Sequence, residues 1–491
     1  MLLATVWRLR YGSAMEQPSF EILREAASRL ARASVLVVGD AMLDRYVYGD
    51  VDRISQEAPV PVLCVQRELA VPGGAANVVR NLGALGVAVA FVSVVGDDQP
   101  GSDLTGLIGG QPGVEPWLLV QGGRVTTLKT RFIGQGQQLL RTDREDAVPI
   151  HPKLAERLVR IARDAIAATS VTILSDYGKG VLGSDVTTPL LAAAKQAGRP
   201  VLVDMRGPDF ARYAGADVLT TSWRNLCSAT GRQTETDAAV AAAAASLRQR
   251  HDFGAVVIRR TGHSLTVAAR EADADAAAPD CVLHLRNHAT EASDTLGLGD
   301  TVVAMLAAAR ATGASLPVAA CLANAAASVL VGRIGTALVR EADLLAALAP
   351  PSNTHKIVSR EVAAERVERW RRVGWRAGFV FGAFDGAGPE AEAMLDGARG
   401  SCDRLTVGLA PDRDGGEPEA VRAARLAALP SVDLVVSSGI EPTAELLRAL
   451  RPELLIEDGA APGRNANAEL MREWGGRVLP ADAATQSEPA V

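Results

Sequence analysis

The sequence predicts a doubly wound α/β fold, followed by a second and smaller α/β domain. Short apolar runs rich in β-branched residues alternate with alanine-rich segments along most of the chain. At 491 residues the chain is also too long for a single hydrophobic core. The alternating pattern stops near residue 350 and then starts again, which indicates a domain boundary there.

The predicted strands of the first domain are apolar on both faces, as in a parallel sheet that helices cover on both sides. They span residues 34–39, 89–96, 171–174 and 200–204, and the predicted helices span 155–168, 238–250 and 301–311. The segment 46–65 is dense in Val and Pro, so we expect a small antiparallel β lid at the sheet edge.

The second domain follows a charged helix at residues 359–372, which we expect to act as a linker stabilised by i,i+4 ion pairs. Its predicted strands span 378–382, 404–409, 432–436 and 454–456. The polar, alanine-rich tail after Pro480 is predicted to be disordered. The predicted organisation is therefore an N-terminal extension and helix over 1–33, a first domain over 34–350, a linker helix over 351–376 and a second domain over 377–491.

Composition limits the function. The net charge of −6 argues against a nucleic-acid partner. The apolar runs are too short to span a membrane, and the five cysteines are scattered, as in a cytoplasmic protein with reduced thiols. Arg8 and Arg10 follow the first apolar stretch, the wrong order for a secretory signal, and Met15 is an alternative start.

The segment D-T-L-G-L-G-D at residues 294–300 runs directly into a predicted helix. The free N–H groups of a helix N-terminus bind anions, and glycine lets the backbone approach a phosphate. Gly297, Leu298 and Gly299 would form this anion hole. Asp300 would be the general base that accepts a proton from a hydroxyl group. The alternative is an ordinary glycine loop that Asp300 caps.

A second glycine turn, Gly73 and Gly74, precedes another predicted helix that carries Asn77. Small residues there permit close approach of a polar ligand, and Asn77 can donate and accept hydrogen bonds. Asp44 follows the first strand, where open α/β sheets bind ligands, and could hold sugar hydroxyls. A tight strand-to-helix turn and a loop cap are the structural alternatives.

Basic residues cluster between positions 129 and 144. They are Lys129, Arg131, Arg141 and Arg144. Arginine forks suit phosphate oxygens, so the cluster is a candidate phosphate site, and a solvated charged face is the alternative. The segment S-D-Y-G-K-G at 175–180 follows a predicted strand and belongs to the same edge of the sheet.

Together these motifs resemble the ribokinase/phosphofructokinase-B family of sugar kinases. R-I-S-Q-E-A-P-V-P-V (53–62), Q-Q-L-L-R-T-D-R-E (137–145), S-D-Y-G-K-G-V (175–181) and L-A-N-A-A-A-S-V-L-V-G-R-I-G-T-A (322–337) are similar to D-glycero-β-D-manno-heptose-7-phosphate kinases. This resemblance implies a ribokinase-like fold over about residues 34–350, a small sugar phosphate as substrate, and ATP with Mg²⁺. It also implies a homodimer and an ATP site at Ser222, Asn225 and Asn324.

The second domain resembles the cytidylyltransferase-like nucleotidyltransferases that form the C-terminal half of bifunctional heptose kinase/adenylyltransferases. The matching segments are F-G-A-F-D (381–385), C-D-R-L-T-V-G-L (402–409), S-V-D-L-V-V (431–436) and L-R-P-E-L-L-I (450–456). The resemblance implies ADP-heptose synthesis for the lipopolysaccharide core.

The chain departs from both family patterns. The two histidines of the nucleotidyltransferase motif fall at Gly388 and Ala391, with Glu390 between them, and its lysine falls at Glu457. The kinase motif Asn-x-x-Glu, tied to the metal–phosphate network, falls at Ser222 and Asn225. We therefore expect a heptose-phosphate kinase with an inactive adenylyltransferase domain. The alternatives are another sugar kinase of this fold, or a catalytically weak scaffold paired with an active partner.

Overall fold

The computed structural model describes residues 15, 18–231, 236–260, 264–270, 280–285, 297–330, 337–348, 353–386, 388–412, 416–437, 443–457 and 464–480. The predicted N-terminal start, the break at 350–352 and the tail after Pro480 lie outside these residues. The chain divides into two compact units, residues 1–349 and 350–491, and each is described by itself.

The first unit is built on a nine-stranded sheet with the order β13-β12-β11-β10-β9-β8-β1-β4-β5. The strands from β11 to β5 in this order are parallel, and β12 and β13 are antiparallel additions. The strands are β1 (Ser34–Gly39), β4 (Ala88–Gly96), β5 (Val114–Gln121), β8 (Val171–Asp176), β9 (Val201–Met205), β10 (Val218–Ser222), β11 (Ala255–Arg259), β12 (Leu265–Ala269) and β13 (Cys281–Leu285).

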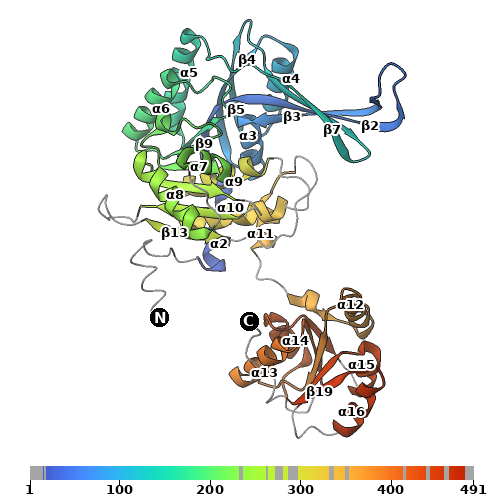
Figure 1. The fold of residues 1–491 in the computed structure, drawn as a ribbon. Coiled ribbons are helices and arrows are strands. Elements are labelled where there is room, and N and C mark those ends of the chain that lie inside the picture. Colours follow the sequence, from blue (N-terminus) through green and yellow to red (C-terminus); the bar gives the residue numbers. More distant parts are fainter. Residues whose placement is uncertain are drawn as a thin grey trace. The chain divides into compact units, whose positions relative to one another are not determined.

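Helices cover both faces of this sheet (Figure 1). They are α2 (Phe20–Ala27), α3 (Ala75–Ala84), α4 (Gln99–Gly109), α5 (Pro152–Ala168), α6 (Ser184–Gln196), α7 (Trp223–Thr230), α8 (Asp237–Arg250), α9 (Leu298–Ala311), α10 (Leu316–Leu330) and α11 (Glu341–Ala347). In β1, Val35 and Val37 pack with α3 and α9, whereas Leu36 and Val38 pack with α5 on the other face. This two-sided burial explains why the strand is apolar throughout and confirms the doubly wound prediction.

The chain changes direction at β1. It moves outward from β1 through β4 to β5, then returns to the other side of β1 and continues through β8, β9 and β10. The carboxyl ends of strands at such a switch point form the usual ligand crevice of an open α/β sheet. Asp40 after β1 and Tyr177 after β8 therefore lie where a ligand site is expected.

The lid is a four-stranded sheet with the order β3-β2-β6-β7, and Figure 1 shows its strands extending away from the main sheet. Its strands are β2 (Ala41–Ile54), β3 (Pro61–Gly74), β6 (Thr127–Gly134) and β7 (Gln137–Arg144). The predicted antiparallel hairpin is confirmed for β2 and β3, but β2 and β6 run parallel, so the whole sheet is mixed. The lid is also larger than predicted, because the basic segment forms two of its strands.

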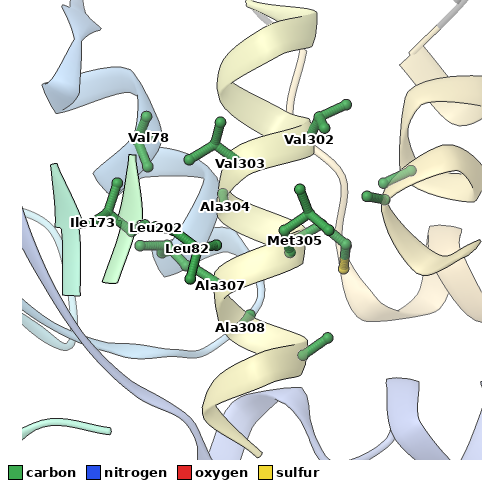
Figure 2. Packing of buried hydrophobic residues seen from close by; sticks show 14 of the residues in the cluster. Val78, Leu82, Ile173, Leu202, Val302, Val303, Ala304, Met305, Ala307 and Ala308 are labelled. Atoms are coloured by element: carbon green, nitrogen blue, oxygen red, sulfur yellow. The ribbon is translucent and has the colours of Figure 1, made fainter. Parts of the chain in front are cut away.

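Helix α9 is buried along most of its length, which holds its N-terminus in a defined place. Its residues from Asp300 to Ala309 are buried. Figure 2 shows Val303 and Ala304 beside Val78 of α3 and Ile173 of β8. Alanines let α9 approach α3 and α10 closely, and this tight packing fixes the position of its first turn.

The second unit is a six-stranded sheet, all of whose strand pairs are parallel, with the order β14-β17-β16-β15-β18-β19. Its strands are β14 (Ile357–Val358), β15 (Ala377–Gly382), β16 (Arg404–Leu409), β17 (Leu434–Ser437), β18 (Leu454–Glu457) and β19 (Arg477–Pro480). Its helices are α12 (Arg360–Arg372), α13 (Pro389–Gly400), α14 (Glu419–Ala428), α15 (Thr443–Leu450) and α16 (Arg464–Arg472). The four predicted strands are all present, and β14 and β19 were not predicted.

The prediction that the charged helix is a linker was wrong. Helix α12 makes i,i+4 ion pairs from Arg369 to Glu365 and from Arg372 to Glu368, as expected. However, Ala363 and Val367 on its other face are buried in the core of the second unit, together with residues of α15. The strand before it, β14, also pairs with β17. The helix is therefore part of the second unit.

Candidate active site

The N-terminus of α9 contains the glycine turn that we predicted as an anion site. Gly297 is the N-cap and adopts a left-handed φ of 78°. A Cβ atom at this position would lie 3.0 Å from Nδ2 of Asn77, so glycine suits both the backbone and the space. Leu298, Gly299 and Asp300 form the first turn, whereas residues 294–296 of the motif lie outside the described part of the chain.

Asp300 is buried, and three side chains from distant segments surround its carboxylate. Asn77 donates from Nδ2 to Oδ2 at 2.7 Å, and the Tyr177 hydroxyl donates to Oδ1. Nη2 of Arg206 lies 3.3 Å from the same Oδ1. Burial raises the pKa of Asp300 above its ordinary value, although the Arg206 charge and the two hydrogen bonds oppose the shift. A raised pKa makes the carboxylate a better proton acceptor.

The loop after β8 presents Tyr177 to Asp300, and Asp40 holds this loop. The buried carboxylate of Asp40 accepts three backbone N–H bonds, from Tyr177 at 2.8 Å, Lys179 at 3.0 Å and Val181 at 3.0 Å. Burial and the Asp300 charge raise the pKa of Tyr177 well above its ordinary value, so the phenol remains protonated and donates. Asp40 is thus a positioning residue that the sequence analysis did not single out.

On the lid, Asp44 of β2 forms a buried ion pair with Arg131 of β6. Nη1 of Arg131 lies 2.6 Å from Oδ1 of Asp44, and its guanidinium stands over the Tyr46 ring at 5.3 Å. A Cβ atom at position 73 would lie 2.0 Å from Oδ2 of Asp44, so Gly73 makes room for the carboxylate. The glycine and the acid, predicted separately as substrate residues, form one unit.

The residues around Asp300 and the Asp44–Arg131 pair of the lid share a neighbour, Arg80 of α3. Its Nη1 donates to Oδ1 of Asn77 at 3.1 Å, while Asn77 donates to Asp300. Burial lowers the pKa of Arg80, and the nearby Tyr46 and Asp44 act against this shift. Asn77 is therefore a link between the base and the lid. The structure brings Asp44, Gly73, Asn77 and Asp300 into one region, with Gly74 as the N-cap of α3.

The other predicted basic residues do not form an open phosphate site. Lys129 lies 2.9 Å from Asp143 and 3.0 Å from Glu145. Arg141 also pairs with Asp143, at 2.9 Å, and is half exposed. Pairing of β6 with β7 places these acidic side chains opposite the cations, which neutralises most of the cluster. Arg144 is exposed at the end of β7.

Of the predicted ATP residues, Ser222 and Asn225 lie together at the start of α7, and Asn324 lies on α10. The Ser222 hydroxyl caps α7 by accepting from the Asn225 backbone N–H at 3.2 Å. Nδ2 of Asn225 donates to Oγ1 of Thr221 at 3.3 Å, so the side chain turns toward the sheet. Asn324 lies on α10, which packs against α9.

Two arginines and an aspartate near the first turn of α9 were not predicted from the sequence. Asp204 in β9 is fully buried and receives Nη1 of Arg259 from β11 at 2.7 Å. Arg206, directly after β9, contacts Asp300 and Tyr177. These residues could have been found, because the segment D-M-R at 204–206 ends an apolar strand, and the carboxyl ends of such strands form the ligand edge of the sheet.

Among the described residues of the second unit, the positions that match the two histidines and the lysine of the nucleotidyltransferase motif carry no cation. Gly388 is the N-cap of α13 and makes no side-chain cap. Glu457, at the end of β18, is buried and accepts from Nδ2 of Asn467 at 2.6 Å. Arg422 is also buried, with hydrogen bonds to the backbone oxygens of Ala410 at 3.1 Å and Glu417 at 2.9 Å.

Among the described residues, no helix is long and apolar enough to cross a membrane. The same residues contain no group of three or more His, Cys, Asp or Glu side chains arranged to hold a metal ion. The donors at Ser222 and Asn225 are neutral. These two side chains therefore add no negative charge for a cation.

Known proteins resemble both the fold and the sequence. The pattern of the pfkB family carbohydrate kinases matches residues 32–343. Bifunctional protein HldE of Acidiphilium cryptum is 51% identical over 465 residues, which cover 92% of this chain and 94% of that protein. Bifunctional protein HldE of Paramagnetospirillum magneticum is 44% identical over 474 residues, covering 94% and 95%.

Solved structures support the fold of the first unit. Arabidopsis thaliana ribokinase, complexed with ribose and ATP, aligns with a TM-score of 0.51 at 20% identity, covering 65% of this chain and 99% of its own. Escherichia coli phosphofructokinase-2, in complex with potassium, aligns with a TM-score of 0.52 at 18% identity, covering 65% and 100%. With a pfkB kinase unit and HldE relatives matched over nearly their full length, the chain is a sugar kinase and belongs to the bifunctional HldE family.

Proposed function

We propose that the first unit transfers a phosphoryl group from ATP to the C1 hydroxyl of D-glycero-β-D-manno-heptose 7-phosphate. The product would be the 1,7-bisphosphate, an intermediate in ADP-heptose synthesis for the lipopolysaccharide core. The observation that carries this proposal is the buried Asp300 at the N-terminus of α9, where a proton acceptor and an anion-binding turn coincide.

In this reaction the lid pair Asp44 and Arg131 would bind the sugar, and Asp300 would take the proton of its hydroxyl group. Gly297, Leu298 and Gly299 would present backbone N–H groups to the transferred phosphoryl group. ATP would enter with Mg²⁺ already bound to its phosphates. The chain's own contribution is then to orient the hydroxyl group, accept its proton and balance phosphate charge.

The test is a coupled assay with the purified full-length chain, ATP, Mg²⁺ and heptose 7-phosphate, in which ADP and the bisphosphate are both measured. We expect ADP release that depends on the heptose phosphate and forms bisphosphate in equal amounts. Parallel assays with ribose and fructose 6-phosphate test for another sugar kinase, and faster turnover of either would replace the heptose assignment. A chain that binds these ligands but turns over none of them would be the weak scaffold.

We further propose that the second unit no longer transfers adenylate. The family's two histidines and lysine would stabilise charge on the nucleotide phosphates, and Gly388, Ala391 and Glu457 supply no cation in their place. Glu457 is instead a buried acid, which would repel phosphate. Its relatives are named bifunctional, so this loss is a property proposed for this chain alone.

We also propose that two copies of the chain pair through the lid. Exposed apolar side chains lie on three lid strands, at Ile54, Val65, Leu69, Leu139 and Leu140. Burying such a surface favours association. Light scattering should give the mass of a dimer, and Leu140→Asp should shift it toward the monomer. A monomeric wild-type chain would contradict the proposal.

A further inference from the structure

Two guanidinium groups flank the anion turn from different strands. On the side of the base, Arg206 lies 3.3 Å from Asp300 Oδ1 and 2.8 Å from the Tyr177 hydroxyl, with its guanidinium 4.2 Å above the Tyr177 ring. On the other side, Arg259 lies against Gly299, where an added Cβ atom would be 3.3 Å from its Nε and 3.7 Å from its Nη2. Two positive charges therefore lie at the first turn of α9.

Arg259 is held so that part of its donor fork remains available. Its Nη1 donates to Asp204 Oδ1 at 2.7 Å and to Thr220 Oγ1 at 3.0 Å. Within the described residues, these are the only hydrogen bonds of the Arg259 guanidinium. Nε and Nη2 lie on the Gly299 side, where a phosphate bound to the turn would meet them. A guanidinium can bind a phosphate with two N–H groups while its third nitrogen stays anchored.

The side chain of Arg206 has room to move away from Asp300. Its side chain is 47% exposed, although its end contacts the buried Asp300. With Arg206 in this position the carboxylate of Asp300 is covered by donors from Asn77, Tyr177 and Arg206, so a sugar hydroxyl must displace one of them. Of the three, Arg206 makes the longest hydrogen bond to the carboxylate, at 3.3 Å, so a sugar hydroxyl would replace that bond first. An incoming phosphate would offer it a more highly charged partner.

The charge that these arginines supply is needed at this edge. Ser222 and Asn225 stand where the family pattern has a pair tied to the metal–phosphate network, and both are neutral and engaged in capping α7 or contacting Thr221. Asp204 is a buried carboxylate near this turn, and Arg259 already pairs with it. Phosphoryl transfer depends on positive charge around the equatorial oxygens of the transferred group.

We propose that Arg206 and Arg259 together form an arginine clamp on the γ-phosphate of ATP, and that Arg206 leaves Asp300 to join it. This inference rests on the kinase function proposed above. In the step, the sugar oxygen forms a bond to the γ-phosphorus while the bond from that phosphorus to the β–γ bridging oxygen breaks. ADP leaves with the electron pair, and the hydroxyl proton passes to Asp300. The arginines stabilise the charge on the transferred group, and departure of Arg206 opens the base only when ATP is present.

The experiment compares Arg206→Met, Arg206→Lys, Arg259→Met and Arg259→Lys with Arg270→Met, a control on the same unit whose surface pair with Asp252 lies outside the site. Steady-state turnover is measured at saturating Mg²⁺. The affinities for ATP and ADP are measured separately by calorimetry, which needs no turnover. Circular dichroism and melting curves check that each variant is folded.

We expect each Met variant to lower kcat by about 100- to 1,000-fold, with little change in the sugar KM. The preference for ATP over ADP should fall at least fivefold in both, because only ATP carries the γ-phosphate. Arg206→Lys should recover part of the rate, whereas Arg259→Lys should recover less because a single ammonium cannot bridge Asp204 and a phosphate. If Arg259→Met does not fold, Arg259→Lys, which keeps the charge beside Asp204, decides its role.

A pH profile separates the clamp from a merely structural role. The groups that face Asp300 are Tyr177, Asn77, Arg206 and the nearby Asp204. Removing the Arg206 cation should raise the pKa of Asp300 and move the acidic limb of kcat/KM to higher pH. An unchanged ATP/ADP ratio, or a kcat within threefold of Arg270→Met, would overturn the clamp. Failure of the wild type to phosphorylate any sugar would instead overturn the kinase assignment, and the ATP/ADP ratio would still test the arginines.

Discussion

The carboxyl ends of the parallel strands carry different chemistry in the two units. In the first unit, Tyr177, Arg206 and Asp300 meet there, and each has a side chain that can act on a ligand. In the second unit, Glu457 lies at the end of β18, and Arg422 of α14 contacts the loop that follows β16. Arg422 is only 1% exposed. Its guanidinium donates to the backbone oxygens of Ala410 and Glu417 and pairs with Asp412 at 2.9 Å, so its donors are engaged within the protein.

The difference separates what holds a sheet together from what its edge offers to a ligand. The central strands of the second sheet, β15 to β18, carry buried apolar residues on both faces, so this sheet keeps its burial whether or not its edge can bind nucleotide. Glu457 illustrates the change. One of its oxygens accepts from Asn467, and the other is buried without a hydrogen-bond partner among the described residues.

The largest effect should come from Asp300→Asn, which removes the base but keeps the shape. We expect kcat to fall by about 100- to 10,000-fold. The matched control is Asp185→Asn, an aspartate in the first turn of α6 on the surface. In the wild type, kcat/KM should fall as the pH drops through the raised pKa of Asp300, because the base must be ionised, and the variant should lose this limb. Near-native turnover of Asp300→Asn would mean that another group takes the proton.

The next prediction concerns adenylyl transfer by the second unit and whether two substitutions can restore it. Full-length Asp300→Asn protein should release no pyrophosphate above background from ATP, Mg²⁺ and heptose 1-phosphate. We expect Gly388→His with Ala391→His to leave this result unchanged, because Glu457 still places an acid at the edge. Pyrophosphate release from the parent protein would restore a bifunctional enzyme, and release after the two histidine substitutions alone would show that the remainder of the site is intact.

A smaller effect is expected for Asp44→Asn on the lid. The neutral amide leaves the buried Arg131 without its counterion, which should cost about 2 kcal/mol of unfolding free energy. We also expect the sugar KM to rise by about tenfold with a smaller change in kcat, since loss of one hydrogen bond between a charged group and the sugar costs about 1.4 kcal/mol of binding free energy, which is a factor of ten. Asp50→Asn is the control, since Asp50 is an exposed residue of the same strand, bonded to Gln66. Equal KM values in the two variants would remove Asp44 from the sugar site.

The smallest effect should come from Asn225→Glu, which returns a carboxylate to the metal–phosphate network. We expect the Mg²⁺ concentration at half-maximal rate to fall by a factor of about three, because an anionic ligand binds Mg²⁺ better than a carboxamide does. Asn225→Gln matches the length without the charge. A lower rate at every Mg²⁺ concentration would indicate that position 225 contacts other groups during turnover.

The sequence determined the features that depend on local pattern. The strands over residues 34–39 and 404–409 were located from their apolar runs alone, because burial on both faces leaves no other residue choice. The glycine turn at Gly297 was also expected from a local signal, although the helix begins at Leu298 and not at residue 301, so Asp300 lies inside its first turn.

Only the tertiary structure decided which side chains meet. Tyr177 and Arg206 are 123 and 94 positions from Asp300 in the chain, and no local pattern relates them. The basic cluster is neutralised because β6 and β7 pair, and α12 belongs to the second unit because one of its faces packs in that core. Electrostatic contacts form between residues that topology brings together, whatever their separation in sequence. Local apolar periodicity therefore predicts the elements of this protein but not the partners of its charged groups.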